Sequence, residues 1–192
     1  MMAIKRVHEN LSLLEIPGHR IASTSGQLWR PPEAGWIKIN TDGSVFDDAP
    51  AGGAGGVARS HLAFLGAWCK QLPGVSDPFI SELLALREGV IFAHLRGYSH
   101  VVMDIDCLEL VNQWNSRGNS LSIAAPIFRE LEGIVPNFVS FSVHHVGREL
   151  NVPAHLCAQR ACTLDGTDSW LDTSPDFLLS CLRADCNRLI KS

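Results

Sequence analysis

Residues 36–44 have the sequence Trp36-Ile37-Lys38-Ile39-Asn40-Thr41-Asp42-Gly43-Ser44. The stretch begins as an alternating β-strand, with its two isoleucines on one face and Trp36, Lys38 and Asn40 on the other. Asp42 continues this strand and comes before the first turn residues, Gly43 and Ser44. A carboxylate at the end of a central strand is costly unless a charged or polar group meets it. We therefore expect Asp42 to belong to a functional site.

A second acid, Glu82, lies in a predicted helix. Asp77 and Pro78 are typical of a helix start, and Gly97 is typical of a helix end. Apolar residues cover most of the circumference between them, which predicts a buried helix. Glu82 shares its face with small residues that allow close contact with a sheet: Ala85, Gly89 and Ala93. We expect Glu82 to point at the sheet, although the helix dipole alone also favours a glutamate in the first turn.

A third acid, Asp106, ends the apolar run Val101-Val102-Met103-Asp104-Ile105-Asp106. Such a run after a helix is typical of a buried parallel strand reached by a crossover. Asp106 lies at the carboxyl end of this strand, where it is also suited to cap a helix that starts near Leu108. We interpret Asp42, Glu82 and Asp106 as three acids that converge on divalent metal, with capping alone as the alternative for Asp106.

The remaining segments complete a mixed α/β pattern. Further strands are expected at 54–60, 63–70 and 138–145, and further helices at 107–116, 123–133 and 152–164. The predicted domain covers residues 29–164, after an N-terminal arm or linker at 1–28. Residues 165–192 form a predicted tail with a short amphipathic helix. The tail offers no residues that suggest chemistry.

A glycine-rich segment runs into the second predicted strand and contains Gly52, Gly53, Gly55 and Gly56. A phosphate-binding loop of the dinucleotide or Walker type needs a helix directly after it, whereas a strand is predicted here. The pattern therefore favours a hairpin with close backbone approach.

The composition excludes several classes of protein. Hydrophobic residues make up 46% of the 192 residues, and the formal net charge is −4, so no overall basic field attracts nucleic acid. The 6 cysteines form no C-x-x-C pair, which argues against a zinc site or a disulfide-stapled scaffold. No signal peptide core and no membrane-length apolar run are present. We expect a soluble intracellular monomer without a membrane partner, in the nucleus or the cytoplasm.

Four segments carry a combined pattern that is highly specific in this order and at these spacings. They are Lys38-Ile39-Asn40-Thr41-Asp42-Gly43-Ser44, Ser81-Glu82-Leu83-Leu84-Ala85-Leu86, Met103-Asp104-Ile105-Asp106 and His145-Val146-Gly147-Arg148-Glu149-Leu150-Asn151-Val152-Pro153-Ala154-His155. Over residues 29–164 the chain resembles the type 1 ribonuclease H family, in the branch found as small plant proteins and at the end of retrotransposon reverse transcriptases.

The resemblance implies an α/β ribonuclease H-like fold, with a five-stranded mixed sheet, strands one to three antiparallel, and helices packed on it. It also implies hydrolysis of the RNA strand of RNA–DNA hybrids by two magnesium ions, with Asp42, Glu82 and Asp106 as catalytic metal ligands. Carboxylate oxygens are the ligands that Mg²⁺ prefers. The RNA strand would be recognised through its 2′-hydroxyl groups. Gly43, Ser44 and Arg148 are the expected nucleic-acid contacts, with pairing to a nearby acid as the alternative for Arg148.

One departure from the family pattern concerns the fourth catalytic metal ligand. The family usually has an aspartate in an Ala-Asp-x-Leu-Ala context, where this chain has Ala154-His155-Leu156-Cys157-Ala158. Imidazole is a weaker ligand than carboxylate for Mg²⁺ and a better one for Mn²⁺. Our hypothesis is that His155 keeps the second metal site but weakens it and shifts the preference toward Mn²⁺. The alternative is a histidine that is merely exposed on its helix.

Two other classes of function stay open beside the enzyme. His155 and the negative net charge also fit a non-catalytic nucleic-acid-binding module derived from a retroelement. An interaction domain that binds through its tail helix is the third possibility. A proofreading exonuclease would need a second acid two residues after Asp42, where this chain has Ser44. A serine hydrolase would need a Gly-x-Ser-x-Gly elbow, which the sequence lacks.

Overall fold

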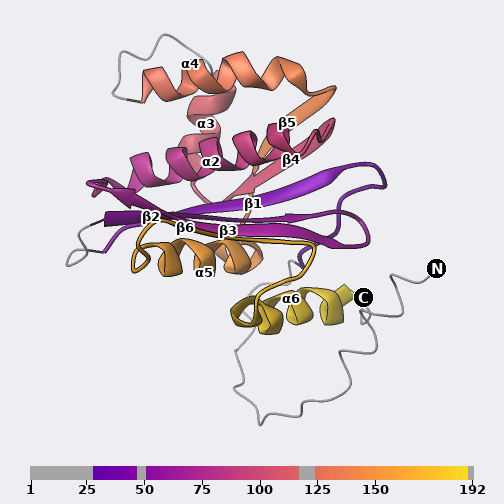
Figure 1. The fold of residues 1–192 in the computed structure, drawn as a ribbon. Helices are drawn as coiled ribbons and strands as arrows, with labels where there is room; N and C mark the ends of the chain where they lie inside the picture. The colour runs from indigo at the N-terminus through magenta and orange to yellow at the C-terminus, as the bar shows by residue number, and fades with distance from the viewer. Residues whose placement is uncertain (1–27, 47–50, 117–123, 190–192) are drawn as a thin grey trace.

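A six-stranded mixed sheet forms the centre of the computed structural model, which describes residues 28–46, 51–116 and 124–189 (Figure 1). The strands are β1 (Ile37–Ser44), β2 (Ala51–Arg59), β3 (Phe64–Pro73), β4 (His100–Ile105), β5 (Ser140–His145) and β6 (Thr167–Leu171). Their order across the sheet is β5-β4-β1-β2-β3-β6. β1, β2, β3 and β6 pair antiparallel, whereas β1, β4 and β5 pair parallel. The predicted N-terminal arm lies, apart from residue 28, outside the described residues.

The prediction of five strands is corrected by β6, which comes from the segment expected to be a tail. β6 pairs with the edge strand β3, from Lys70 opposite Thr167 to Gly66 opposite Leu171. It is short, and its residues are exposed or half-buried, so its sequence carries only a weak strand pattern. Trp170 holds it against the following helix, because its ring lies 5.5 Å from that of Phe177 in an edge-to-face arrangement. The sheet therefore continues beyond residue 164.

The helices cover both faces of the sheet (Figure 1). α2 (Pro78–Leu95), α3 (Leu108–Ser116) and α4 (Ala125–Ile134) lie on one side, and α5 (Val152–Ala161) and α6 (Asp176–Leu189) lie on the other. Single 3₁₀ turns precede β5 (Val135–Asn137) and α5 (Arg148–Leu150). The predicted helices are all present, including the amphipathic tail helix, which is α6. Within the described ranges, no helix has both the length and the apolar character needed to cross a bilayer.

α2 begins and ends where its capping residues predict. The Asp77 carboxylate accepts a hydrogen bond from the backbone N–H of Ile80 at 2.9 Å. At the other end, Gly97 takes a positive φ of 68°, which favours glycine. Between them, Gly89 lies against β1 and β4, since an added Cβ would come within 2.7 Å of a Thr41 methyl group. The small face of α2 therefore contacts the sheet, as expected.

The glycines of β2 serve close packing and not phosphate binding. β2 is a strand that is buried along its whole length and is followed by β3. A Cβ atom at Gly53 or Gly55 would overlap the backbone of Ala158 in α5. α5 therefore rests directly on the sheet, and this close contact sets the depth at which its side chains meet the end of β1.

We expect Gly55→Ala to lower the free energy of unfolding by at least about 2 kcal/mol, because the new methyl group meets rigid backbone. Gly133→Ala is the matched control: no atom lies within 4 Å of an added Cβ there, and α4 should gain about 0.5 kcal/mol. Urea unfolding of both variants measures the difference. An unchanged midpoint for Gly55→Ala would show that α5 does not pack on β2 in this way.

Candidate metal-binding active site

The structure brings Asp42, Glu82 and Asp106 together at one end of the sheet. One carboxylate oxygen from each residue lies within 4.8 Å of the others. The three residues come from the end of β1, the N-terminal part of α2 and the residue after β4. This spacing lets a single cation contact all three side chains.

The parallel pairing of β1 with β4 brings two of these acids side by side. Asn40 lies opposite Asp104 in the register, so both strands end at the same edge of the sheet. Glu82 reaches this edge from α2, and its Oε2 accepts a hydrogen bond from the backbone N–H of Gly43 at 3.1 Å. Gly43 permits this approach because an added Cβ would overlap the backbone of α2. Glu82 therefore points at the sheet and not into solvent.

Burial and mutual repulsion raise the pKa of two of these carboxyl groups. Burial is the largest cause for Asp42, whose pKa rises to about 6 although the hydrogen bond from His155 opposes the shift. Burial and the charges of Asp42 and Asp106 raise the pKa of Glu82 to about 9. The cluster therefore favours protons or another cation near neutral pH.

His155 contacts one member of the cluster, Asp42. Its Nδ1 lies 2.9 Å from Oδ2 of Asp42, and its side chain is 51% exposed. This hydrogen bond raises the pKa of His155. An ionised carboxylate only accepts hydrogen bonds, so Nδ1–H donates and Nε2 is left as the second ring nitrogen. His155 thus lies beside the site, with about half of its side chain in solvent. The group of side chains that converge closely enough to share one cation consists of Asp42, Glu82 and Asp106.

The predicted nucleic-acid contacts surround the cluster. Arg148 pairs with an acid, since its Nε lies 3.7 Å from Oδ2 of Asp106, yet its side chain is 92% exposed. The N–H of Gly43 is used by Glu82, as described above. Ser44 is half-buried, and its carbonyl accepts a hydrogen bond from the Cys162 thiol at 3.5 Å. Arg148 is therefore the most accessible of the three predicted contacts.

Two buried amides without a predicted role, Asn40 and Asn151, lie beside the acids. The Nδ2 group of Asn151 donates to the carbonyl of Thr41 at 3.0 Å and to Oδ1 of Asp106 at 3.3 Å. Asn40 in turn donates to Oδ1 of Asn151 at 3.1 Å. One feature of the sequence could have indicated this contact: Asn40 lies two residues before Asp42, on the same face of the strand.

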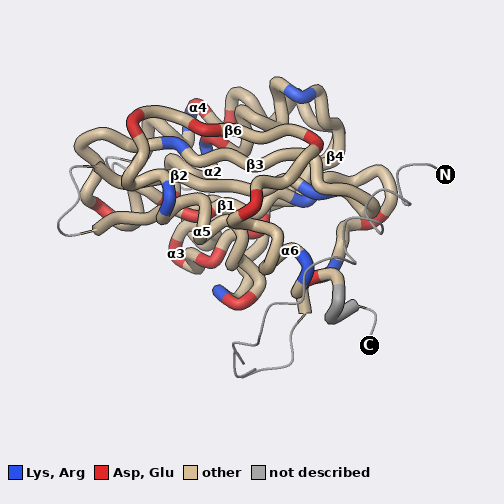
Figure 2. The backbone as a smooth tube through the Cα atoms, turned by 60° about the horizontal axis from the view of Figure 1, so that its bottom comes forward, with Lys and Arg blue, Asp and Glu red and all other residues tan. Residues whose placement is uncertain are grey.

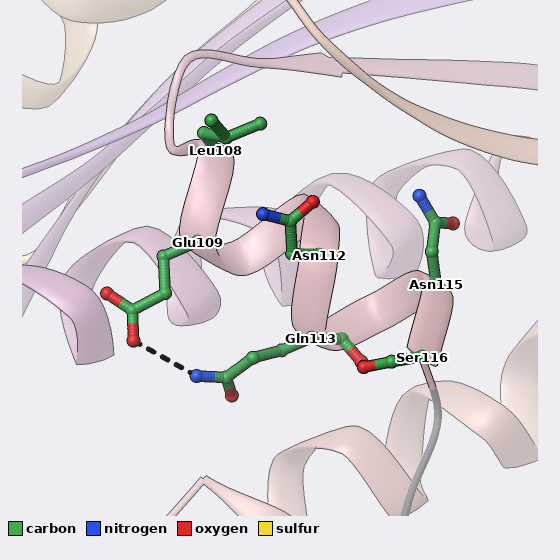
Figure 3. A pocket seen from close by; sticks show the side chains of 6 residues that line it. All are labelled: Leu108, Glu109, Asn112, Gln113, Asn115 and Ser116. Carbon is green, nitrogen blue, oxygen red and sulfur yellow. Dashed lines mark hydrogen bonds between the residues drawn. The ribbon is translucent and has the colours of Figure 1, made fainter.

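A hollow lies along α3, and Figure 3 shows the side chains that line it. It has a volume of about 750 Å³ and is lined by six residues of that helix: Leu108, Glu109, Asn112, Gln113, Asn115 and Ser116. Within this lining, the side-chain amide of Gln113 donates to Glu109 at 3.1 Å, and the hydroxyl of Ser116 donates to the carbonyl of Gln113 at 3.3 Å. None of the three acids, nor His155, lines this hollow.

The positive charges do not gather at the site. Lys and Arg are scattered along the backbone in Figure 2, between Asp and Glu positions. Within residues 28–46, 51–116 and 124–189, the Lys and Arg positions do not gather into one broad basic region, and the net charge of the full sequence is −4. Recognition of nucleic-acid phosphates by these residues would therefore depend on local contacts and on bound cations.

Comparison with known proteins identifies relatives with this architecture. The family model described as "Reverse transcriptase-like" matches residues 40–161. A protein of Arabidopsis thaliana named "Putative ribonuclease H protein" is 28% identical over 185 residues, which are 95% of this chain and 29% of that protein. The chain thus spans less than a third of the length of this relative.

Solved ribonuclease H structures share the fold. The N-terminal RNase H domain of a Mycobacterium tuberculosis protein matches with a TM-score of 0.61 and 19% identity, over 66% of this chain and 93% of that one. RNase H1 of Halobacterium salinarum matches with a TM-score of 0.58 and 18% identity, over 66% of this chain and 96% of that one. LC11-RNase H1 in complex with an RNA/DNA hybrid matches with a TM-score of 0.59 and 19% identity, over 66% of this chain and 96% of that one. The chain belongs to the reverse transcriptase-like family of ribonuclease H-like domains.

Proposed function

We propose that this chain is a metal-dependent endonuclease that hydrolyses the RNA strand of RNA–DNA hybrids. The observation that carries the proposal is the convergence of Asp42, Glu82 and Asp106 within 4.8 Å. Two relatives support the choice of substrate: one is named as a ribonuclease H protein, and another was solved with an RNA/DNA hybrid. The catalytic unit would be the domain at 29–164, with β6 and α6 packed on it.

The side chains at this edge fit Mg²⁺. Three carboxylates supply hard oxygen ligands, and the raised pKa values of Asp42 and Glu82 mean that a divalent cation would relieve their repulsion. When bound, two such ions activate the attacking water and stabilise charge on the leaving 3′ oxygen. Asp42, Glu82 and Asp106 would hold the ions, and His155 would complete the second site through Nε2.

Recognition of the nucleic acid would use groups around the cluster. Arg148 extends into solvent next to Asp106, so its guanidinium group can reach a phosphate while it stays close to the metal ligands. Ser44 and the backbone at Gly43 lie at the end of β1, beside Asp42. In this proposal they contact the minor groove of the hybrid, where the 2′-hydroxyl groups identify RNA.

A non-catalytic nucleic-acid-binding module is the second candidate. The contact that favours it is the hydrogen bond between His155 and Oδ2 of Asp42 at 2.9 Å. A protonated imidazole would occupy this carboxylate oxygen and compete with a metal ion for it. The cleavage assay below separates the two candidates.

Asp42→Asn should reduce cleavage of a labelled RNA–DNA hybrid by more than about 100-fold in Mg²⁺ or Mn²⁺, because a neutral amide holds the ions poorly. Asp165→Asn makes the same chemical change at an exposed loop residue and should cleave like the wild type. Binding of the hybrid without turnover by the wild type, in either metal, would instead support the non-catalytic module.

The wild type should cleave faster in Mn²⁺ than in Mg²⁺ when both are low and equal in concentration, since imidazole favours Mn²⁺. His155→Asp should raise the apparent affinity for Mg²⁺ at least about tenfold. His155→Ala should lose activity in Mn²⁺ if the imidazole is a ligand. Equal wild-type rates in both metals, unchanged in His155→Ala, would contradict a ligand role for His155.

Stability should depend on pH through Glu82. Its folded-state pKa of about 9 lies above the ordinary value of 4.5, so the folded state holds this proton more tightly than the unfolded state does. The stabilisation is complete below pH 4.5 and is lost as the pH rises toward 9. In a chelating buffer at pH 8, Glu82→Gln should therefore melt at least about 3 °C above the wild type, with a smaller gap at pH 5.

Mg²⁺ should then stabilise the wild type at pH 8 and have little effect on Glu82→Gln, which lacks one ligand. Glu132→Gln changes an exposed glutamate of α4 and is the matched control, with no expected change at either pH. A loss of stability in Glu82→Gln that is as large at pH 8 as at pH 5 would contradict the repulsion described here.

A further inference from the structure

A continuous path of hydrogen bonds, buried in all but its last, part-buried bond, joins α6 to the acidic cluster. Asp185 of α6 accepts from Nη1 of Arg59 at 2.6 Å, and Nη2 of Arg59 donates to Oδ1 of Asn40 at 2.9 Å. Asn40 then donates to Oδ1 of Asn151 at 3.1 Å, and Asn151 donates to Oδ1 of Asp106 at 3.3 Å. We call Asp185, Arg59, Asn40 and Asn151 the relay. All four of its residues are buried, between 0% and 7% exposed.

The chemistry of these groups fixes the direction of every bond in the relay. A guanidinium group only donates hydrogen bonds, so the oxygen of the Asn40 carboxamide must face Arg59. The NH₂ group of Asn40 must then face Asn151, which presents its own oxygen in return. The NH₂ group of Asn151 is thereby turned toward Asp106. Two backbone carbonyls favour the same orientation: that of Leu150 accepts from Asn40 at 3.4 Å, and that of Thr41 accepts from Asn151 at 3.0 Å. Arg59 and these carbonyls together ensure that a donor, and not an oxygen, meets the carboxylate.

We propose that Arg59, Asn40 and Asn151 are positioning residues that orient the Asp106 carboxylate for metal, and that Asp185 anchors them from α6. The proposal rests on the function proposed above, because it assigns Asp106 as a metal ligand. Metal ligands are commonly held by outer hydrogen bonds of this kind, and removal of such a partner typically lowers metal affinity about 10- to 100-fold. The C-terminal helix is therefore part of the active unit.

The cost of burying Arg59 supports a role beyond packing. Its guanidinium group lies 3.6 Å from the ring centroid of Trp29, and it is compensated by Asp185 on one side. Its Nε has no hydrogen-bond partner, although the atom is buried. A buried ion pair is often no more stabilising than apolar side chains of similar volume, so stability alone does not account for Arg59. Its fixed set of donors offers a further role, because Arg59 is the side chain that holds the oxygen of Asn40, and Asn40 in turn contacts Asn151.

The test compares variants that change donors with a matched removal of a guanidinium group elsewhere. Arg59→Met removes the donors, and Arg59→Lys keeps a donor at the end of the side chain. Asn40→Asp has nearly the same shape but presents only oxygens, so it repels Oδ1 of Asn151 and opposes the orientation in which Asn151 donates to Asp106. Arg87→Met breaks the ion pair with Glu130 on α4, at 2.6 Å, and serves as the control.

Two measurements are made on each full-length variant. The affinity for Mn²⁺ is determined by calorimetry, and the side-chain amide resonances of Asn151 are recorded by NMR in a chelating buffer. We expect Arg59→Met and Asn40→Asp to bind Mn²⁺ at least about tenfold more weakly and to shift the Asn151 amide resonances. Arg59→Lys should recover most of the affinity. Arg87→Met should match the wild type in both measurements.

The outcomes separate this inference from the proposed function. Normal Mn²⁺ affinity in a folded Asn40→Asp variant overturns the inference and leaves the nuclease proposal intact, even if Arg59→Met does not fold. A wild type that binds no Mn²⁺ overturns the nuclease proposal and, with it, the role of the relay toward metal. The Asn151 resonances then show whether Arg59 orients this amide: unchanged resonances in both variants overturn that step as well.

Discussion

The parallel pairing of β1 with β4 is the constraint on which the site depends. Parallel neighbours end at the same edge of a sheet, so Asp42 and Asp106 meet although 64 positions separate their numbers in the chain. Two carboxylates in contact are unfavourable, and α2 adds a third at the same point. The core must therefore supply the free energy that holds these groups together, and the close contacts of α2 and α5 with the sheet at Gly89 and Gly55 provide part of it.

Much of this arrangement was predictable because local signals set it. Asp77 and Gly97 fix the ends of α2, and the small residues of its inner face indicate that Glu82 faces the sheet. β6 was missed because a short, half-exposed edge strand has little periodicity, and its pairing with β3 depends on an unpaired edge that only the folded sheet presents. The local pattern therefore predicted the elements that pack on both faces better than the one at the edge.

The candidate site shows the same division. Asp42 and Asp106 followed from their places at strand ends, and Glu82 from its place on the small face of a helix, combined with a family resemblance. The contacts of Asn40 and Asn151 did not, because the two amides are partners separated by 111 residues, and which end of each faces the other depends on Arg59 and on the carbonyls of Leu150 and Thr41. Hydrogen-bond direction is a property of the assembled core, and no spacing along the chain encodes it.

His155 changes the charge balance of the site in a way that explains how the three acids tolerate one another. An aspartate at this position would add a fourth negative charge, whereas the imidazole donates to Asp42 and lowers the pKa of that carboxyl group relative to burial alone. His155 thus supplies part of the stabilisation that a cation would give. A metal ion that took Oδ2 of Asp42 would have to weaken this hydrogen bond. Under the proposed function, metal affinity would therefore reflect a competition between a cation and a neighbouring side chain, in addition to the number of carboxylates.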